Sequence, residues 1–231
     1  MDAALFYTTI TTLFEGFGLT VYISLASIVM ASIIGLAAAV MRMSTSWFPS
    51  RLAFAYSTCF RGTPLLVQLF IIYYGLGTLS FVRESPVLWW VFSDGARCAI
   101  LTIALNSGAY ISEVLRGGLQ SVPRGQIEAA KACGMPSLLR FRRIIFPLAI
   151  RQALPAYSNE LVLAIKGTSL ASTIAVMELT GYAKRLMSQS YVIIETFVVA
   201  GILYLAINLF LLACVHLTER WLGVSRLSTR A

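Results

Sequence analysis

The feature that most constrains this chain is an apolar run near its beginning, from Phe17 to Met41, that contains no charged residue. A helix needs about 20 largely apolar residues to cross the hydrocarbon core of a bilayer. Of all 231 residues, 58% are apolar and 12% are charged, whereas a typical soluble domain is about 25% charged. The sequence therefore predicts an integral membrane protein, and it excludes a soluble globular domain and a disordered chain.

Five stretches are apolar and long enough to span the membrane, so we expect an all-α protein with one transmembrane domain over residues 1–231. The expected spans cover residues 17–41, 64–82, 98–115, 149–165 and 192–217. The second span could begin earlier, within 52–60, and the fourth is the least apolar of the five. Small residues recur every four positions in the first and third spans, which predicts close helix packing there. They are Ser27, Ala31, Gly35 and Ala39, and then Ala104, Gly108 and Ser112.

Basic residues gather on alternate connections between the expected spans. The first connection and the long third one are rich in arginine, whereas the N-terminal segment carries Asp2 and Glu15 and no basic residue. Lysine and arginine concentrate on the cytoplasmic side of membrane proteins, so the N-terminus is expected outside and the C-terminus in the cytoplasm. Topology thus explains the net charge of +8, and membrane lipids rather than nucleic acid are the expected surroundings.

The titratable residues of the sequence do not indicate a catalytic site. Four cysteines lie far apart and His216 is the only histidine, which argues against a zinc cluster, paired haem ligands or a disulfide framework. A phosphate-binding loop of the form G-x-x-x-x-G-K-[ST] does not occur. We expect no catalytic residue, metal or cofactor, and we expect any energy from ATP to arrive through a partner.

The third connection, residues 116–148, carries the most specific motif. Pro123 suits the first turn of a short helix, and Gly134 its end, with Pro136 just beyond. Ser137 can cap a second helix, and Pro147 begins the return into the membrane. The spacing across it is Glu128-Ala129-Ala130, three residues, Gly134, nine residues, Ile144, one residue, and Phe146-Pro147.

This spacing resembles the EAA loop of bacterial ABC-importer permeases, from which only Phe146, in place of leucine, departs. Residues 60–69 (FRGTPLLVQL) and 153–160 (ALPAYSNE) are similar to the polar amino-acid permeases, above all the M subunits of histidine and opine permeases. The resemblance implies the type I ABC-importer permease fold in the bacterial inner membrane, with a periplasmic N-terminus. It also implies a second, Q-type permease subunit, a dimer of ATP-binding subunits and a periplasmic substrate-binding protein. The ATPase would be coupled through Glu128, Ala129, Ala130, Gly134, Ile144 and Pro147.

Charges inside a span are costly, so those of the fourth span are candidate functional residues. At about 1.5 Å per residue from Pro147, Glu160 lies about 20 Å and Lys166 about 28 Å along the helix. The resemblance implies that both line the substrate cavity, where Thr168 and Ser169 would add hydroxyl groups. The alternatives are that Glu160 pairs with Arg61 or a helix dipole, and that Lys166 extends to the lipid headgroups.

Further polar residues are candidates in the second and third spans. Arg61 and Thr63 precede Pro64, which breaks the helix and frees carbonyl groups that could bind a polar ligand. Arg61 either faces the pathway or anchors the helix at the cytoplasmic surface. We expect Asn106 to join helices, and Glu113 and Arg116 to form a surface pair.

The resulting hypothesis is a permease subunit, and not an enzyme, of an ATP-driven importer. The cargo would be a polar, basic or zwitterionic amino acid or an opine, of the histidine, arginine, lysine, octopine or nopaline type. The alternative is a membrane channel or a membrane-anchored subunit of another complex.

Overall fold

The computed structural model describes residues 3–222, and all regular secondary structure in that range is helical. In chain order the helices are α1 (Ala3–Arg42), α2 (Trp47–Arg61), α3 (Leu65–Phe70), α4 (Ser80–Glu84), α5 (Pro86–Phe92), α6 (Gly95–Gln120), α7 (Arg124–Ala132), α8 (Ser137–Arg140), α9 (Phe146–Gly167), α10 (Leu179–Ser190) and α11 (Ile193–Leu222). Shorter π or 3-10 turns adjoin them: η1 (Ile71–Gly75), η2 (Leu76–Thr78), η3 (Phe141–Ile145) and η4 (Thr168–Ile174).

Within residues 3–222, three helices, α1, α6 and α11, are long and apolar enough to cross a membrane alone. Two bent pairs pass the same test together, which gives up to five spans. One pair joins α2 to α3 with a bend of 105°, and the other joins the α9 segment to α10 with a bend of 47°. The five predicted stretches fall on these elements, but the helices begin and end beyond the predicted limits.

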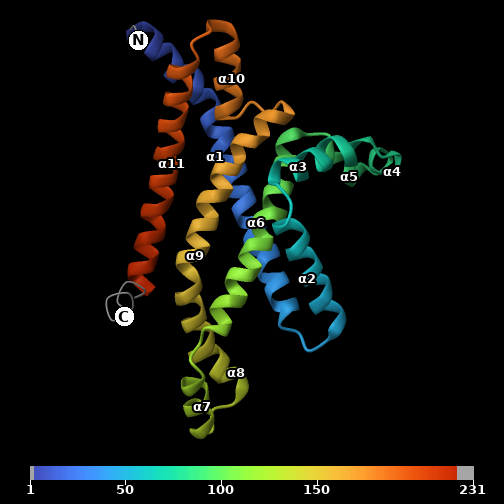
Figure 1. Cartoon of the computed structure of the whole chain (residues 1–231), viewed down its shortest axis with the longest axis vertical. Helices are drawn as coiled ribbons and strands as arrows, with labels where there is room; N and C mark the ends of the chain where they lie inside the picture. The colour runs from blue at the N-terminus through green and yellow to red at the C-terminus, as the bar shows by residue number, and fades with distance from the viewer. Residues whose placement is uncertain (1–2, 223–231) are drawn as a thin grey trace.

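The second span differs most from the prediction, because it is not a straight helix over residues 64–82. The span begins with α2, which ends at Gly62, and the chain then turns sharply before α3 begins. Pro64 has no N–H and restricts the residue before it, so the helix cannot continue through this point. The segment from α3 to α5 extends sideways from the rest of the molecule as an arm (Figure 1).

The predicted small-residue stripes lie where α1 and α6 pack together along much of their lengths. A methyl group on Gly35 would lie 2.6 Å from Ile111 Cγ2, and one on Gly108 would lie 3.2 Å from the Ala31 carbonyl oxygen. Such distances leave no room for a side chain, so these glycines set how closely the two helices approach. The prediction of close packing is confirmed.

The third connection folds as two short helices, close to the predicted limits. α7 begins directly after Pro123, and Gly134 follows its end with a φ of +70°, in the left-handed region that glycine tolerates best. Pro136, rather than Ser137, occupies the cap position of α8, and Pro147 lies in the first turn of α9. α7 and α8 thus form a projection at the end of the molecule (Figure 1).

The opposite end is held by a buried carboxylate that the sequence analysis had not singled out. Glu178 is fully buried and caps α10 by accepting the N–H groups of Thr180 and Gly181, each at 2.9 Å. The hydroxyl group of Tyr204, on α11, donates to the same carboxylate at 2.6 Å. The Leu179 N–H donates to Thr20 of α1 at 3.0 Å, so three helices meet there.

Two adjacent glycines on α6 provide a test of the packing. A methyl group on Gly118 would lie 2.6 Å from the Ala149 carbonyl oxygen of α9, whereas one on Gly117 would meet nothing within 4 Å. Gly118→Ala should therefore destabilise the subunit by about 1–3 kcal/mol through overpacking. Gly117→Ala should be neutral or slightly stabilising, because alanine favours the helix. Thermal unfolding of the purified protein measures both, and equal midpoints for the two variants would contradict the close α6–α9 contact.

Candidate functional site

The break between α2 and α3 exposes carbonyl groups that other side chains of the protein then satisfy. Gln68 Nε2 donates to the Phe60 carbonyl at 2.8 Å and to Thr63 Oγ1 at 2.7 Å. Asn106 of α6 donates to the same Phe60 carbonyl at 3.2 Å and to Gln68 Oε1 at 3.0 Å. Asn106 therefore joins helices, as predicted. The freed Phe60 carbonyl is occupied, which corrects the expectation that the break leaves such groups open to a ligand.

Arg61 ends α2 at this break and faces α6. Tyr110 donates its hydroxyl group to the Arg61 carbonyl at 3.3 Å, and its ring lies 5.4 Å from the guanidinium carbon. The Arg61 side chain is half-exposed, and its Nη1 lies 4.0 Å from Glu113 Oε2. Thr63 is exposed, but its hydroxyl group donates to the Cys59 carbonyl at 2.8 Å and accepts from Gln68.

Glu113 lies at the centre of a charged cluster that joins three helices. Its carboxylate contacts Arg116 Nη2 at 2.6 Å, Arg42 Nε at 3.4 Å and the hydroxyl group of Ser57 at 3.2 Å, in addition to Arg61. The Glu113 side chain is only 15% exposed. The predicted pair of Glu113 with Arg116 is confirmed, but it belongs to a partly buried network rather than to the surface. We call these five residues the Glu113 cluster.

The fourth span presents its two charged residues in different surroundings. Glu160 is half-buried, and Arg61 is the basic residue whose charge acts on it. Among residues 3–222, Arg61 and Glu160 do not form an ion pair, and the carboxylate in contact with Arg61 is Glu113. Lys166 is exposed, and its ammonium group has no acceptor among the described side chains. Both residues keep free capacity to bind a ligand of opposite charge.

The two hydroxyl residues that follow Lys166 are placed differently from each other. Thr168 is fully buried and donates to the Ile165 carbonyl at 2.7 Å, so it faces the helix packing rather than an open surface. Ser169 is partly exposed and donates to the Lys166 carbonyl at 2.7 Å. The structure thus places Ser169, but not Thr168, where a solute could reach it.

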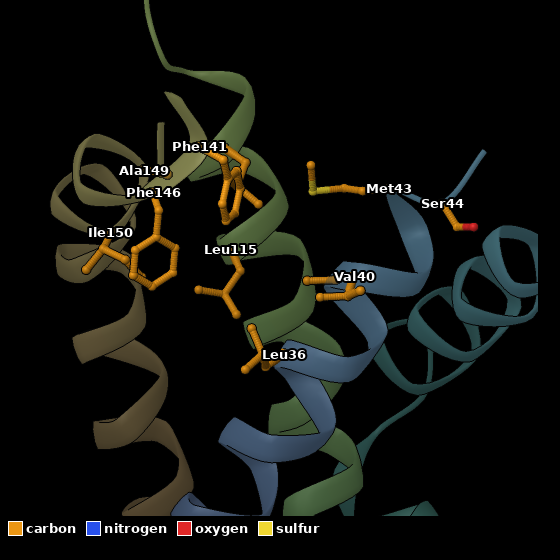
Figure 2. A pocket seen from close by; sticks show the side chains of 11 residues that line it. Leu36, Val40, Met43, Ser44, Leu115, Phe141, Phe146, Ala149 and Ile150 are labelled. Atoms are coloured by element: carbon orange, nitrogen blue, oxygen red, sulfur yellow. The ribbon is translucent and has the colours of Figure 1, made fainter. Parts of the chain in front are cut away.

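At the other end of α9, an apolar groove lies between the spans, beside the point where η3 continues into α9. Figure 2 shows side chains of α1, α6, η3 and α9 converging on this groove, which has a volume of about 430 Å³. Phe146, the residue that departs from the EAA pattern, lines it and lies 5.9 Å from the ring of Phe141. No ion pair crosses the groove among its lining residues.

The predicted residues fall into two regions of the molecule. Arg61, Thr63 and Glu160 lie near the middle break, whereas Glu128, Ala129, Ala130, Gly134, Ile144 and Pro147 lie on or beside the α7–α8 projection. Sequence reasoning missed the roles of Arg42, Gln68 and Glu178. For Gln68, an amide inside a predicted span was the available signal, since such a group requires partners.

These features define a multi-pass membrane subunit with a broken span and a paired-helix projection at one end. Residues 7–224 match the family described as "Binding-protein-dependent transport system inner membrane component", and the chain belongs to that family. It is a permease subunit of an ABC transport system, located in the inner membrane.

Relatives of known name cover nearly the whole chain. It is 47% identical to the nopaline transport system permease protein NocM of Agrobacterium fabrum, over 96% of this chain and 92% of that protein. It is 39% identical to the histidine/lysine/arginine/ornithine transport system permease protein HisM of Salmonella typhimurium, over 90% and 89%.

Solved structures show the same fold. The permease in a crystal structure of an amino acid ABC transporter with histidines superimposes with a TM-score of 0.82 at 30% identity, covering 95% of this chain and 98% of that one. A chain of the methionine transporter MetNI, in an inward-facing conformation, superimposes with a TM-score of 0.75 at 18% identity, covering 96% and 99%. The predicted type I ABC-importer permease fold is confirmed.

The Glu113 cluster supplies the next test. Glu113→Gln would leave Arg42, Arg61 and Arg116 without their shared carboxylate, so we expect a loss of about 2 kcal/mol in stability. Glu84→Gln, at an exposed position on α4, removes the same charge without a partner and should have little effect. Thermal unfolding in detergent measures both. A Glu113→Gln protein as stable as the Glu84→Gln control would show that the cluster does not hold the helices together.

Proposed function

We propose that this subunit forms part of the pathway by which an ATP-driven importer takes up a cationic amino acid or an opine. The relatives named for histidine, lysine, arginine, ornithine, nopaline and octopine support this substrate class. The observation that carries the proposal is the placement on one span of two charged residues, Glu160 and Lys166, that have no ion-pair partner within residues 3–222. Such residues are retained inside membranes where they bind substrate or ions.

The two charges suit the two ends of such a substrate. The Glu160 carboxylate would accept hydrogen bonds from an ammonium or guanidinium group, and the Lys166 ammonium would bind a carboxylate. The guanidinium group of Arg61 contacts the Glu113 carboxylate, and its positive charge also acts on Glu160. Arg61 would therefore influence how Glu160 binds the substrate. Ser169 and Thr63 would contribute hydroxyl groups at the edges of the pathway, and Thr168 would act only if its packing changed.

The complex that we propose contains four kinds of subunit. This chain would pair with a second, Q-type permease and rest on a dimer of ATPases, which bind the ATP, while a periplasmic binding protein delivers the substrate. The distribution of basic residues supports a periplasmic N-terminus and a cytoplasmic C-terminus. Co-purification of an ATPase with this subunit tests the assembly, and a channel or an unrelated anchored subunit would purify without one.

The α7–α8 projection is the proposed contact with the ATPase. Glu128 and Ala129 are exposed on α7, whereas Ala130 is buried against the rest of the projection. The small side chains would let the helix enter a groove on the ATPase. Movement there would reach the spans through η3, which continues directly into α9, because packed helices transmit displacement.

Gly134 gives a test of this coupling. Its positive φ disfavours valine, a β-branched residue, by about 1–2 kcal/mol, whereas asparagine tolerates the left-handed region. A Cβ at this position would meet nothing within 4 Å, so the two variants differ mainly in backbone strain. Gly134→Val should reduce transport per ATP hydrolysed several-fold, while Gly134→Asn stays near the native value. Proteoliposome uptake and phosphate release, measured together, supply the ratio, and native coupling in Gly134→Val would refute the role.

Substrate recognition is tested by removing one charge at a time. Glu160→Gln keeps the shape and one acceptor oxygen but removes the charge, so the apparent affinity for arginine should fall about ten- to hundred-fold. Lys166→Gln should weaken uptake of an opine, which carries additional carboxylates, more than uptake of arginine. Uptake is measured in membranes whose content of assembled complex is determined in parallel. Unchanged affinity for arginine in a normally assembled Glu160→Gln complex would exclude Glu160 as a ligand.

A further inference from the structure

A basic pocket lies between the last turn of α1 and the first turns of α2, apart from the substrate residues. It is lined by Arg42, Ser50, Arg51 and Phe54 and has a volume of about 350 Å³. The α1–α2 connection lies at the same end of the molecule as α7 and α8 (Figure 1). None of the substrate or coupling residues lines this pocket.

The side chains of the pocket are arranged to bind an anion. The guanidinium carbon of Arg42 lies 4.8 Å from the centre of the Phe54 ring, which supports one face of the guanidinium group. The Ser50 hydroxyl group, at 3.4 Å from the Arg42 carbonyl, joins the two helices. Arg51 is exposed and has no carboxylate partner within residues 3–222. Planar guanidinium groups of this kind recognise phosphate by paired hydrogen bonds.

The charges around the pocket are unbalanced. Arg42 already shares the Glu113 carboxylate with Arg61 and Arg116. Within residues 3–222, no other acidic residue forms an ion pair with these three arginines. Three arginines thus share one carboxylate, and Arg51 adds a further positive charge at the pocket. This excess favours a bound anion, and Arg42 would connect that anion to the Glu113 cluster.

The surroundings of the pocket indicate where the anion comes from. Trp47 is 70% exposed and Phe48 is 67% exposed, and Met43 and Leu52 are also largely exposed. Exposed aromatic and apolar side chains beside arginines, at the ends of two spanning helices, are typical of the membrane–water interface. Basic pockets between spanning helices at that level bind anionic lipid headgroups.

We propose that the pocket between α1 and α2 binds the phosphate group of an anionic phospholipid, held by Arg42 and Arg51. The acyl chains would lie along the exposed apolar residues beside it. The leaflet is the cytoplasmic one if the orientation proposed above holds, but binding itself requires no particular substrate or orientation. The lipid phosphate and Glu113 contact the same arginine, so the lipid influences how firmly the inner ends of α1, α2 and α6 are held together.

The test compares lipid retention by matched variants of the purified complex. The complex is equilibrated with vesicles of phosphatidylethanolamine and phosphatidylglycerol, and retained phosphatidylglycerol is counted by native mass spectrometry. Arg51→Gln should lower its affinity about five-fold. Arg51→Lys keeps the charge and should retain part of the binding. Arg220→Gln, an exposed position in the last turn of α11, removes an equal charge outside the pocket and should leave retention unchanged.

Three results would overturn the proposal. Equal losses in Arg51→Gln and Arg220→Gln would mean that general surface charge, rather than the pocket, attracts the lipid. Displacement of phosphatidylglycerol by inorganic phosphate at similar concentration would make a free anion the ligand. Retention of phosphatidylethanolamine as strongly as phosphatidylglycerol by the native complex would exclude recognition of an anionic headgroup.

Discussion

The rest of the structure depends on how the chain satisfies backbone groups where its second span is broken. Inside a membrane an unpaired carbonyl is costly, so a helix can stop there only where other groups replace its hydrogen bonds. Gln68 and Asn106 bond the Phe60 carbonyl, and Tyr110 bonds the Arg61 carbonyl. These bonds attach the break to α6 and allow α3 to turn by 105° away from α2. They also fix Arg61 between Glu113 and the face of α9 that carries Glu160.

Two kinds of contact then divide the molecule. Close backbone packing at Gly35, Gly108 and Gly118 gives a rigid centre in which α1, α6 and α9 cannot move apart without losing contact. The α7–α8 projection is joined to that centre through η3, which continues directly into α9, and the apolar groove of Figure 2 lies beside this junction. This arrangement suits a part that receives movement from a partner.

Much of the fold could be predicted from the sequence, because the length and hydropathy of a stretch and its glycine and proline residues constrain the chain locally. The five apolar stretches, the small-residue stripes and the limits of α7 at Pro123 and Gly134 all depend on near neighbours in the chain. The 105° bend, the three arginines on Glu113, and the burial of Thr168 and Glu178 depend on contacts between distant segments, which no local pattern encodes. Of the candidate substrate residues, the sequence identified the span and the charges, but not that Arg61 contacts Glu113 in place of Glu160.

The central claim is that this subunit carries a charged substrate along α9 with energy supplied by a separate ATPase. The most direct measurement is the uptake of labelled arginine and labelled nopaline into proteoliposomes that contain the complete complex, with the binding protein and ATP supplied. We predict that at least one of the two accumulates above its outside concentration only when ATP is hydrolysed, and that omitting this subunit abolishes accumulation. Binding-protein-stimulated ATP hydrolysis without accumulation of either solute would contradict the claim.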